Sequence, residues 1–287
     1  MEIKKIGVLG AGAMGNGIAQ VCAQTGYDVI MRDIADEFVQ RGMKTIEGFL
    51  AKSVEKGKLS EDDKNKTLGR IKGTTKLDDL KDVDFVIEAV LEDMALKKQV
   101  FQEMDKLTRP EAILATNTSS MSITEIGAAT KRPDKVVGMH FFNPVPLMKL
   151  VEVIKGMDTS EETSTVALAL TEKLGKMPVL VKKDVAGFVV NRLMILQLME
   201  AIKIYEEGIA SIEDIDKAVK AGLNHPMGPF ELMDLTGLDI NYHVNEYFHH
   251  ELNMELKHVT PYSLKAKVLA NKLGRKTKEG WYKYDKK

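Results

Sequence analysis

The sequence is poor in cysteine, in long apolar runs and in charge of one sign. Cys22 is the one cysteine among 287 residues, which excludes an intrachain disulfide. No apolar run is long enough to span a bilayer, and the first residues lack the pattern of a secretory signal peptide. The net charge is −1, so no overall field attracts nucleic acid or a membrane surface. We therefore expect a cytoplasmic protein with neither of these partners.

The spacing that metal ligands need is also missing. His249 and His250 are adjacent, so they cannot lie on one face of a helix as a ligand pair does. We expect both side chains to be exposed, and we expect no metal site. The composition, 44% hydrophobic and 29% charged, is ordinary for a globular protein, and the length predicts two domains.

A glycine-rich stretch, Gly10-Ala-Gly-Ala-Met-Gly15, follows the apolar run 3–9. A helical pattern comes next, and a second predicted strand, 27–31, ends just before Asp33. A Gly-x-Gly-x-x-Gly motif in this setting, with an acid after the second strand, is typical of dinucleotide-binding domains. The predicted cofactor contacts are Gly10, Gly12, Ala13, Met14, Gly15 and Asp33.

Asp33 also bears on the choice between NAD and NADP. Its carboxylate can accept hydrogen bonds from the adenosine ribose, whereas a 2′-phosphate there would be repelled by about 4 kcal/mol at an effective dielectric constant of 20. This favours NAD. NADP stays open, because Arg32 stands beside the acid and could bind a phosphate.

Apolar runs alternate with helical patterns through the first two thirds of the chain. Further strands are predicted at 84–90, 112–115, 136–139, 150–154 and 177–181. This alternation predicts a mostly parallel sheet of the Rossmann-like α/β type, with a helical hairpin inserted at 36–70. Beyond Gly187 the patterns are helical. We therefore expect a dinucleotide-binding domain at 1–185 and an all-helical substrate and dimerisation domain at 186–287.

His140 ends one of these apolar runs, and Glu152 is the single carboxylate in the next. A carboxylate is costly to bury without a partner, and an imidazole held by a carboxylate is a suitable general base. The alternative is a structural histidine at a strand end. Several candidate site residues fall just past predicted strands and so should share one edge of the sheet, and these are Gly15, Asp33, Glu92, Ser119 and His140.

Lys52 and Lys56 lie in the predicted turn between the two inserted helices. Such a cluster is usually solvated surface. It could also bind a phosphorylated handle of a substrate, and the residues alone leave both interpretations open.

With these motifs in place, the chain resembles the short-chain L-3-hydroxyacyl-CoA dehydrogenases, in particular the bacterial 3-hydroxybutyryl-CoA dehydrogenases. The resemblance covers nearly the whole length. It rests on the segments 10–15, 117–120, 138–144, 149–152, 187–192, 225–229 and 273–276, with Gly280. His-Phe-Phe-Asn-Pro at 140–144 and Gly-Phe-Val-Val-Asn-Arg at 187–192 are its most specific parts.

The resemblance implies a role for each matching residue. His140 would be the general base held by Glu152, and Ser119 and Asn191 would bind the C3 oxygen of an acyl-CoA substrate. Lys52 and Lys56 would contact the CoA phosphates. The implied neighbours of the cofactor are Glu92, Lys97, Asn117 and Asn143. A homodimer formed through the C-terminal helical domain is also implied.

Two other functions remain open at this point. A dehydrogenase of free 3-hydroxy acids or sugar acids would share the cofactor half and His140 but would not need Lys52 and Lys56. A non-catalytic protein, structural or NAD-sensing, would be favoured by loss of Ser119, His140 or Asn191, and all three are present.

Overall fold

The computed structural model describes residues 2–252 and 260–284. The chain forms two compact units, Met1–Phe188 and Val189–Lys287. We call them the N-terminal unit and the C-terminal unit, and each is described by itself.

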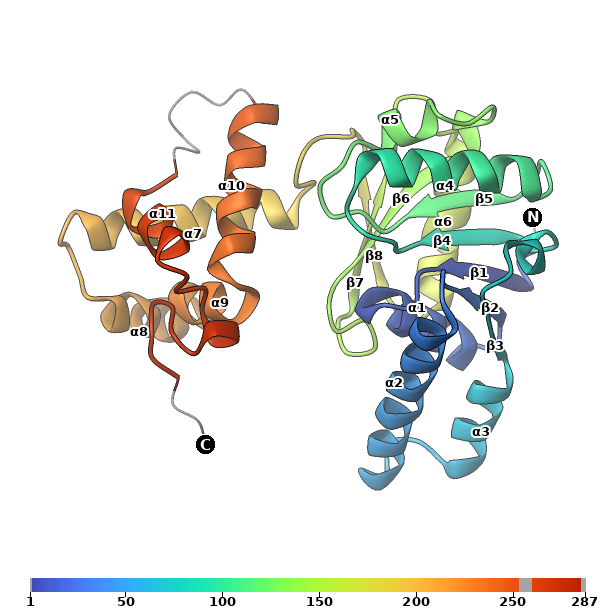
Figure 1. The fold of residues 1–287 in the computed structure, drawn as a ribbon, viewed down its shortest axis with the longest axis horizontal. Helices are drawn as coiled ribbons and strands as arrows, with labels where there is room; N and C mark the ends of the chain where they lie inside the picture. The colour runs from blue at the N-terminus through green and yellow to red at the C-terminus, as the bar shows by residue number, and fades with distance from the viewer. Residues whose placement is uncertain (1, 253–259, 285–287) are drawn as a thin grey trace. The chain divides into compact units, whose positions relative to one another are not determined.

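The N-terminal unit is built on one eight-stranded sheet with the order β3-β2-β1-β4-β5-β6-β7-β8 (Figure 1). The strands are β1 Lys5–Leu9, β2 Asp28–Arg32, β3 Ile71–Thr74, β4 Phe85–Glu88, β5 Ile113–Thr116, β6 Val136–Phe141, β7 Leu150–Ile154 and β8 Met177–Val181. Every pairing is parallel except that of β6 with β7. The predicted mostly parallel sheet is confirmed. β3 was not predicted, because its sequence Ile-Lys-Gly-Thr carries little apolar pattern.

Helices cover both faces of this sheet. They are α1 Ala13–Gln24, α2 Asp36–Glu55, α3 Glu61–Gly69, α4 Met94–Leu107, α5 Ile123–Gly127 and α6 Glu161–Lys173, with 3₁₀ turns at Leu77–Leu80 and Pro133–Lys135. α2 and α3 form the predicted hairpin and extend beyond the sheet (Figure 1). The N-caps of α3, α5 and α6 are Ser60, Ser122 and Ser160, whose hydroxyls accept from the third helical N–H.

Alternate residues of the central strands enter two separate cores. Ile113 and Ala115 of β5 pack into the core under α1 and α6, whereas Leu114 packs into the core under α4 and α5. A strand with helices on both faces is apolar on both sides. This is why these strands appeared in the sequence as continuous apolar runs.

The antiparallel pair β6–β7 determines the local geometry that matters most. Eight residues, 142–149, join the two strands, which is too short for the crossover that a parallel pair requires. In the resulting register His140 lies directly opposite Glu152. His140 is thus inside β6, not past its end as the sequence suggested, because the ladder with β7 continues through it.

The C-terminal unit is helical over its described residues. It contains α7 Val190–Glu206, α8 Ile212–Leu223, α9 Pro229–Thr236, α10 Leu238–Leu252 and α11 Tyr262–Leu269, with a 3₁₀ turn at Arg275–Thr277. α7 was expected to begin at Phe188. It begins two residues later because Gly187 and Phe188 have positive φ angles of 76° and 49°, and the left-handed region interrupts a right-handed helix.

Two buried aspartates hold the last described segment of this unit. Asp216 accepts hydrogen bonds from the backbone N–H groups of Phe230 and Glu231 and from the Tyr282 hydroxyl. Asp234 accepts from the N–H groups of Trp281 and Tyr282 and from the Tyr284 hydroxyl. Gly228 and Gly280 lie so close to these carboxylates that a Cβ atom on either glycine would overlap them, at 2.3 Å and 2.1 Å.

Within the described residues, His249 and His250 are exposed as predicted. No helix described here has both the length and the hydropathy needed to cross a membrane.

Candidate active site

The glycine-rich loop has the shape that a pyrophosphate requires. Gly10 has φ +101°, and a Cβ atom on it would lie 2.4 Å from the Ala89 carbonyl oxygen. On Gly15 a Cβ would lie 1.9 Å from the Gly10 carbonyl oxygen, whereas on Gly12 it would meet nothing within 4 Å. The backbone at Gly12 is therefore open to a ligand, beside the N-terminus of α1, where unpaired N–H groups favour anions.

Asp33 lies just past β2 and braces this loop. Its Oδ2 accepts from the Ala11 N–H at 2.7 Å and its Oδ1 from the Ile34 N–H at 2.7 Å. Each carboxylate oxygen has a second lone pair that can accept a ribose hydroxyl. Arg32 is occupied nearby, since its Nε donates to the Thr75 carbonyl oxygen at 3.3 Å. Asp33 thus has a structural role that the sequence did not suggest.

His140 and Glu152 form a buried pair, as predicted. His140 Nδ1 lies 2.8 Å from Glu152 Oε2, and the two residues are 5% and 0% exposed. A neutral imidazole that donates through Nδ1 keeps its lone pair on Nε2. The rings of Phe142 and Phe188 lie 4.4 Å and 5.7 Å from the imidazole ring. This arrangement holds the ring in one orientation with a basic nitrogen available.

A pocket of about 310 Å³ brings the glycine loop and the histidine together. Its lining includes Met14, Glu92, Lys97, Ser119, His140 and Asn143. Asn117 also lines it, and its Oδ1 accepts from the Phe141 N–H at 2.9 Å, which ties the end of β5 to β6 beside His140. Seven predicted site residues thus converge within the N-terminal unit.

Glu92 is the centre of a network at one side of this pocket. Its Oε1 accepts from the Thr118 hydroxyl and from the Ser119 N–H at 2.9 Å, and its Oε2 lies 3.0 Å from Lys97 Nζ. Burial acts to raise the pKa of Glu92, but the Lys97 charge and these hydrogen bonds outweigh it, so the pKa is lowered. Glu92 is therefore an ionised group beside Ser119.

The loop after His140 is braced by a lysine that sequence reasoning missed. Lys176 Nζ donates to the carbonyl oxygens of Val145 at 2.6 Å and Met148 at 2.7 Å, and burial lowers its pKa. On the other side, Gly17 of α1 lets Val145 approach so closely that a Cβ on Gly17 would lie 2.9 Å from the Val145 Cβ. Lys176 carried no sequence signal, because its partners are backbone carbonyl groups.

Three predicted residues lie elsewhere. Lys52 is in the last turn of α2 and Lys56 follows that helix, and both are exposed and do not line the pocket. Asn191 belongs to the C-terminal unit, where it is the second residue of α7 and not a full turn inside it as expected. The predicted contacts of all three with a substrate stay predictions.

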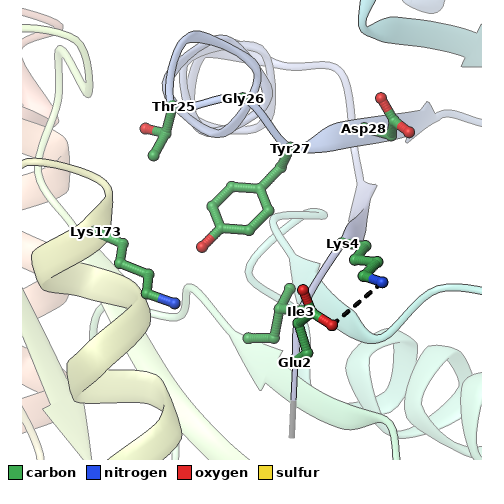
Figure 2. A pocket seen from close by; sticks show the side chains of 8 residues that line it. All are labelled: Glu2, Ile3, Lys4, Thr25, Gly26, Tyr27, Asp28 and Lys173. Atoms are coloured by element: carbon green, nitrogen blue, oxygen red, sulfur yellow. Dashed lines mark ion pairs between the residues drawn. The ribbon is translucent and has the colours of Figure 1, made fainter.

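A larger pocket, of about 480 Å³, is formed where β1 and β2 begin. Figure 2 shows Tyr27 and Lys173 turned toward it, with an ion pair of 3.2 Å between Lys4 and Glu2 at its margin. The pocket lies at the amino ends of these strands, whereas the glycine loop follows the carboxyl end of β1. Ligands of open α/β sheets bind at the carboxyl ends of the strands. Volume alone therefore does not identify the active site.

Two family models together match most of the chain. Residues 5–185 match the NAD binding domain of 3-hydroxyacyl-CoA dehydrogenase, and residues 187–284 match its C-terminal domain. The chain belongs to the 3-hydroxyacyl-CoA dehydrogenase family. The family accounts for the cofactor, NAD, and for the oxidoreductase class of the enzyme.

Named relatives match nearly the whole chain. The 3-hydroxybutyryl-CoA dehydrogenase of Clostridioides difficile is 47% identical over 98% of this chain and 100% of its own length. The human mitochondrial hydroxyacyl-coenzyme A dehydrogenase is 45% identical over 98% of this chain and 91% of its own. The crystal structure of (S)-3-hydroxybutyryl-CoA dehydrogenase from Ralstonia eutropha superposes with a TM-score of 0.96 at 46% identity, covering 99% of this chain and 100% of that one.

Proposed function

We propose that this dehydrogenase interconverts (S)-3-hydroxybutyryl-CoA and acetoacetyl-CoA with NAD. The observation that carries the proposal is the buried pair of His140 and Glu152, 2.8 Å apart, at a pocket that also contains Ser119 and the edge of the glycine loop. A base and an oxygen-binding group at the cofactor's loop are what removal of a hydroxyl proton with transfer of a hydride needs.

Each catalytic residue has one task. His140 Nε2 takes the proton of the C3 hydroxyl as the C3–H bond breaks, and Glu152 stabilises the imidazolium that forms. Ser119 holds the C3 oxygen, and Asn191 is proposed to do the same from the C-terminal unit. Bound NAD supplies the acceptor for the hydride, held by the glycine loop and Asp33. In reduction His140 returns the proton to the C3 oxygen.

The CoA part of the substrate is assigned to the basic end of the α2–α3 hairpin. Lys52 and Lys56 are exposed there, and their ammonium groups suit phosphates. We further propose that the all-helical domain, 186–287, completes the substrate site and forms a homodimer, and that the enzyme is cytoplasmic. Support for the dimer comes from large apolar side chains exposed on this unit, among them Leu193, Ile209 and Tyr262.

The test is the steady-state oxidation of NADH with acetoacetyl-CoA and, separately, with free acetoacetate. We expect rapid turnover with the thioester alone, and much slower turnover with NADPH. Rapid turnover with acetoacetate would favour the free-acid dehydrogenase instead. Binding of NADH without turnover of either substrate would favour the non-catalytic protein.

A separate experiment tests whether Lys52 and Lys56 bind the CoA part of the substrate. The double variant Lys52→Ala/Lys56→Ala should raise KM for acetoacetyl-CoA roughly fivefold with little change in kcat, because exposed ion pairs contribute about 0.2–1 kcal/mol each. The matched control, Lys106→Ala/Lys131→Ala, removes two exposed lysines on the α4 side of the unit and should leave KM unchanged. If the two double variants have the same KM for acetoacetyl-CoA, the lysines of the hairpin do not bind CoA and are ordinary solvated surface.

A further inference from the structure

Glu88 is a buried carboxylate at the end of β4 that the catalytic scheme above does not use. It is 0% exposed. Its Oε1 accepts from Lys97 Nζ at 2.8 Å and from the Val90 N–H at 2.7 Å, and its Oε2 accepts from the Thr116 hydroxyl at 2.7 Å. Three donors from three different parts of the unit thus converge on this one carboxylate.

Lys97 is shared between two carboxylates. Its Nζ lies 2.8 Å from Glu88 and 3.0 Å from Glu92, and the lysine side chain is 1% exposed. One ammonium and two carboxylates leave one net negative charge. That charge is held at the wall of the pocket, because Glu92 and Lys97 both line it. In such partly desolvated surroundings a charge acts with a lower effective dielectric constant than it would in water.

The nicotinamide ring has to enter this same pocket. Met14 of the glycine loop and His140 both line it. Hydride transfer requires contact between the nicotinamide ring and the substrate's C3 carbon, and C3 carries the oxygen whose proton His140 takes. The ring is cationic in NAD⁺ and neutral in NADH. A net charge beside the ring therefore changes the affinity of the protein for NAD⁺ but has little direct effect on its affinity for NADH.

We propose that Glu88 sets the balance between bound NAD⁺ and bound NADH, by giving the trio of Glu88, Lys97 and Glu92 one net negative charge beside the nicotinamide. The inference rests on the proposed function and adds a specificity-determining residue to it. Glu88 acts through charge and through Lys97, without contact with the substrate.

The experiment measures the dissociation constants of NAD⁺ and of NADH by calorimetry with the full chain near neutral pH. Glu88→Gln removes the net negative charge, so Kd for NAD⁺ should rise about fivefold to tenfold relative to Kd for NADH, the size expected of one charge at about 10 Å with an effective dielectric constant of about 30. In Glu88→Gln/Lys97→Met the net negative charge is restored by Glu92. The ratio of the two constants should then return to within about twofold of the wild-type ratio, even where both constants change.

Thr116→Val is the matched control for local disturbance. It removes a donor to Glu88 without changing any charge, so its ratio should stay at the wild-type value. If Glu88→Gln does not give folded protein, Glu92→Gln makes the same one-charge change at the exposed end of the trio and should shift the ratio in the same direction, by at least as much because Glu92 lines the pocket.

Two results would overturn the inference. One is a ratio that does not move in the charge-changing variants, and the other is a ratio that moves as far in Thr116→Val. Failure of the proposed function is distinguishable, because it would appear as a wild-type protein that binds NADH but turns over neither the thioester nor the free acid.

Discussion

At the scale of single residues, the site depends on polar groups placed one at a time in apolar strands. Glu152 and Glu88 are both 0% exposed, and each is held by groups that come from another element. An isolated buried charge is strongly destabilising unless it is paired. A carboxylate within an apolar run is therefore a signal of a partner, and the partner indicates what the carboxylate does.

The first prediction concerns the proposed base. His140→Gln should lower kcat for acetoacetyl-CoA reduction by about 10²- to 10⁴-fold, because positioned proton transfer contributes about that much. The Kd of NADH, measured by fluorescence titration, should stay within about twofold of the wild-type value. His243→Gln is the control, since that histidine is exposed on α10 and far along the chain. Turnover of His140→Gln near the wild-type rate would remove His140 as the base.

Much of the site could be predicted from single residues, but some of its contacts could not. The pair of His140 and Glu152 followed from two polar residues in neighbouring apolar runs. Glu88 gave the same signal, but its partner is Lys97, which the family resemblance implied to be a neighbour of the cofactor without indicating that it pairs with Glu88. Contacts with backbone groups, such as those of Lys176, leave no sequence signal at all, because every residue offers a carbonyl group.

At the scale of elements, one carboxylate joins the start of two strands. Asp84, just before β4, accepts from the N–H groups of Lys4 at 2.8 Å and Lys5 at 2.9 Å, and it also pairs with Arg109. Burial acts to raise the pKa of Asp84, but the backbone N–H groups and the guanidinium together lower it. The folded state therefore favours the ionised carboxylate.

The second prediction follows from that direction. A carboxyl group whose pKa is lower in the folded state stabilises the fold above its unfolded pKa and loses this effect as pH falls through the folded pKa. Asp84→Asn should therefore lower the free energy of unfolding by about 1–2 kcal/mol at pH 7, with the difference disappearing in acid below the ordinary range of an aspartate. Urea unfolding at several pH values measures it. Asp82→Asn, at an exposed site two residues away, should have little effect, and a pH-independent difference for Asp84→Asn would contradict the assignment.

Helices and strands were predicted well where the apolar pattern was strong. They were predicted poorly where an element is short or where backbone conformation sets its boundary. The central strands and the change to helices after Gly187 were correct. β3 was missed because an edge strand of four residues needs few apolar side chains. The start of α7 was misplaced because the left-handed conformations of Gly187 and Phe188 follow from packing, with Phe188 buried in the core of the N-terminal unit.

At the scale of the whole molecule, the two units can be followed separately. Trp281 is the one tryptophan of the chain and belongs to the C-terminal unit, where its ring lies 5.0 Å from that of Phe230. Binding of NADH, in contrast, reports on the N-terminal unit, which carries the glycine loop. Tryptophan fluorescence and cofactor binding therefore measure different halves of the protein.

The third prediction uses this separation. Asp234→Ala leaves the buried N–H groups of Trp281 and Tyr282 without their acceptor, and each unsatisfied buried group costs about 1–3 kcal/mol. We expect the urea midpoint of tryptophan fluorescence to fall while the Kd of NADH stays unchanged. Glu200→Ala, an exposed site on α7, should alter neither. A loss of NADH affinity that parallels the fluorescence change would show that the two units unfold together.

The hydrogen bonds that Asp216 and Asp234 accept from segment 281–284 affect the order in which the two units can fold during synthesis. β1 leaves the ribosome first and pairs with β2 and β4, which are also made early, so the N-terminal unit can assemble while synthesis continues. Segment 281–284, by contrast, is translated after all the helices that the structure describes in its unit, yet it supplies donors to both aspartates. Until it emerges, Asp216 of α8 lacks one of its three donors, and Asp234 of α9 lacks all three of the donors named above. A message cut before codon 281 should thus yield a chain with a finished dinucleotide-binding half and a helical half that never closes.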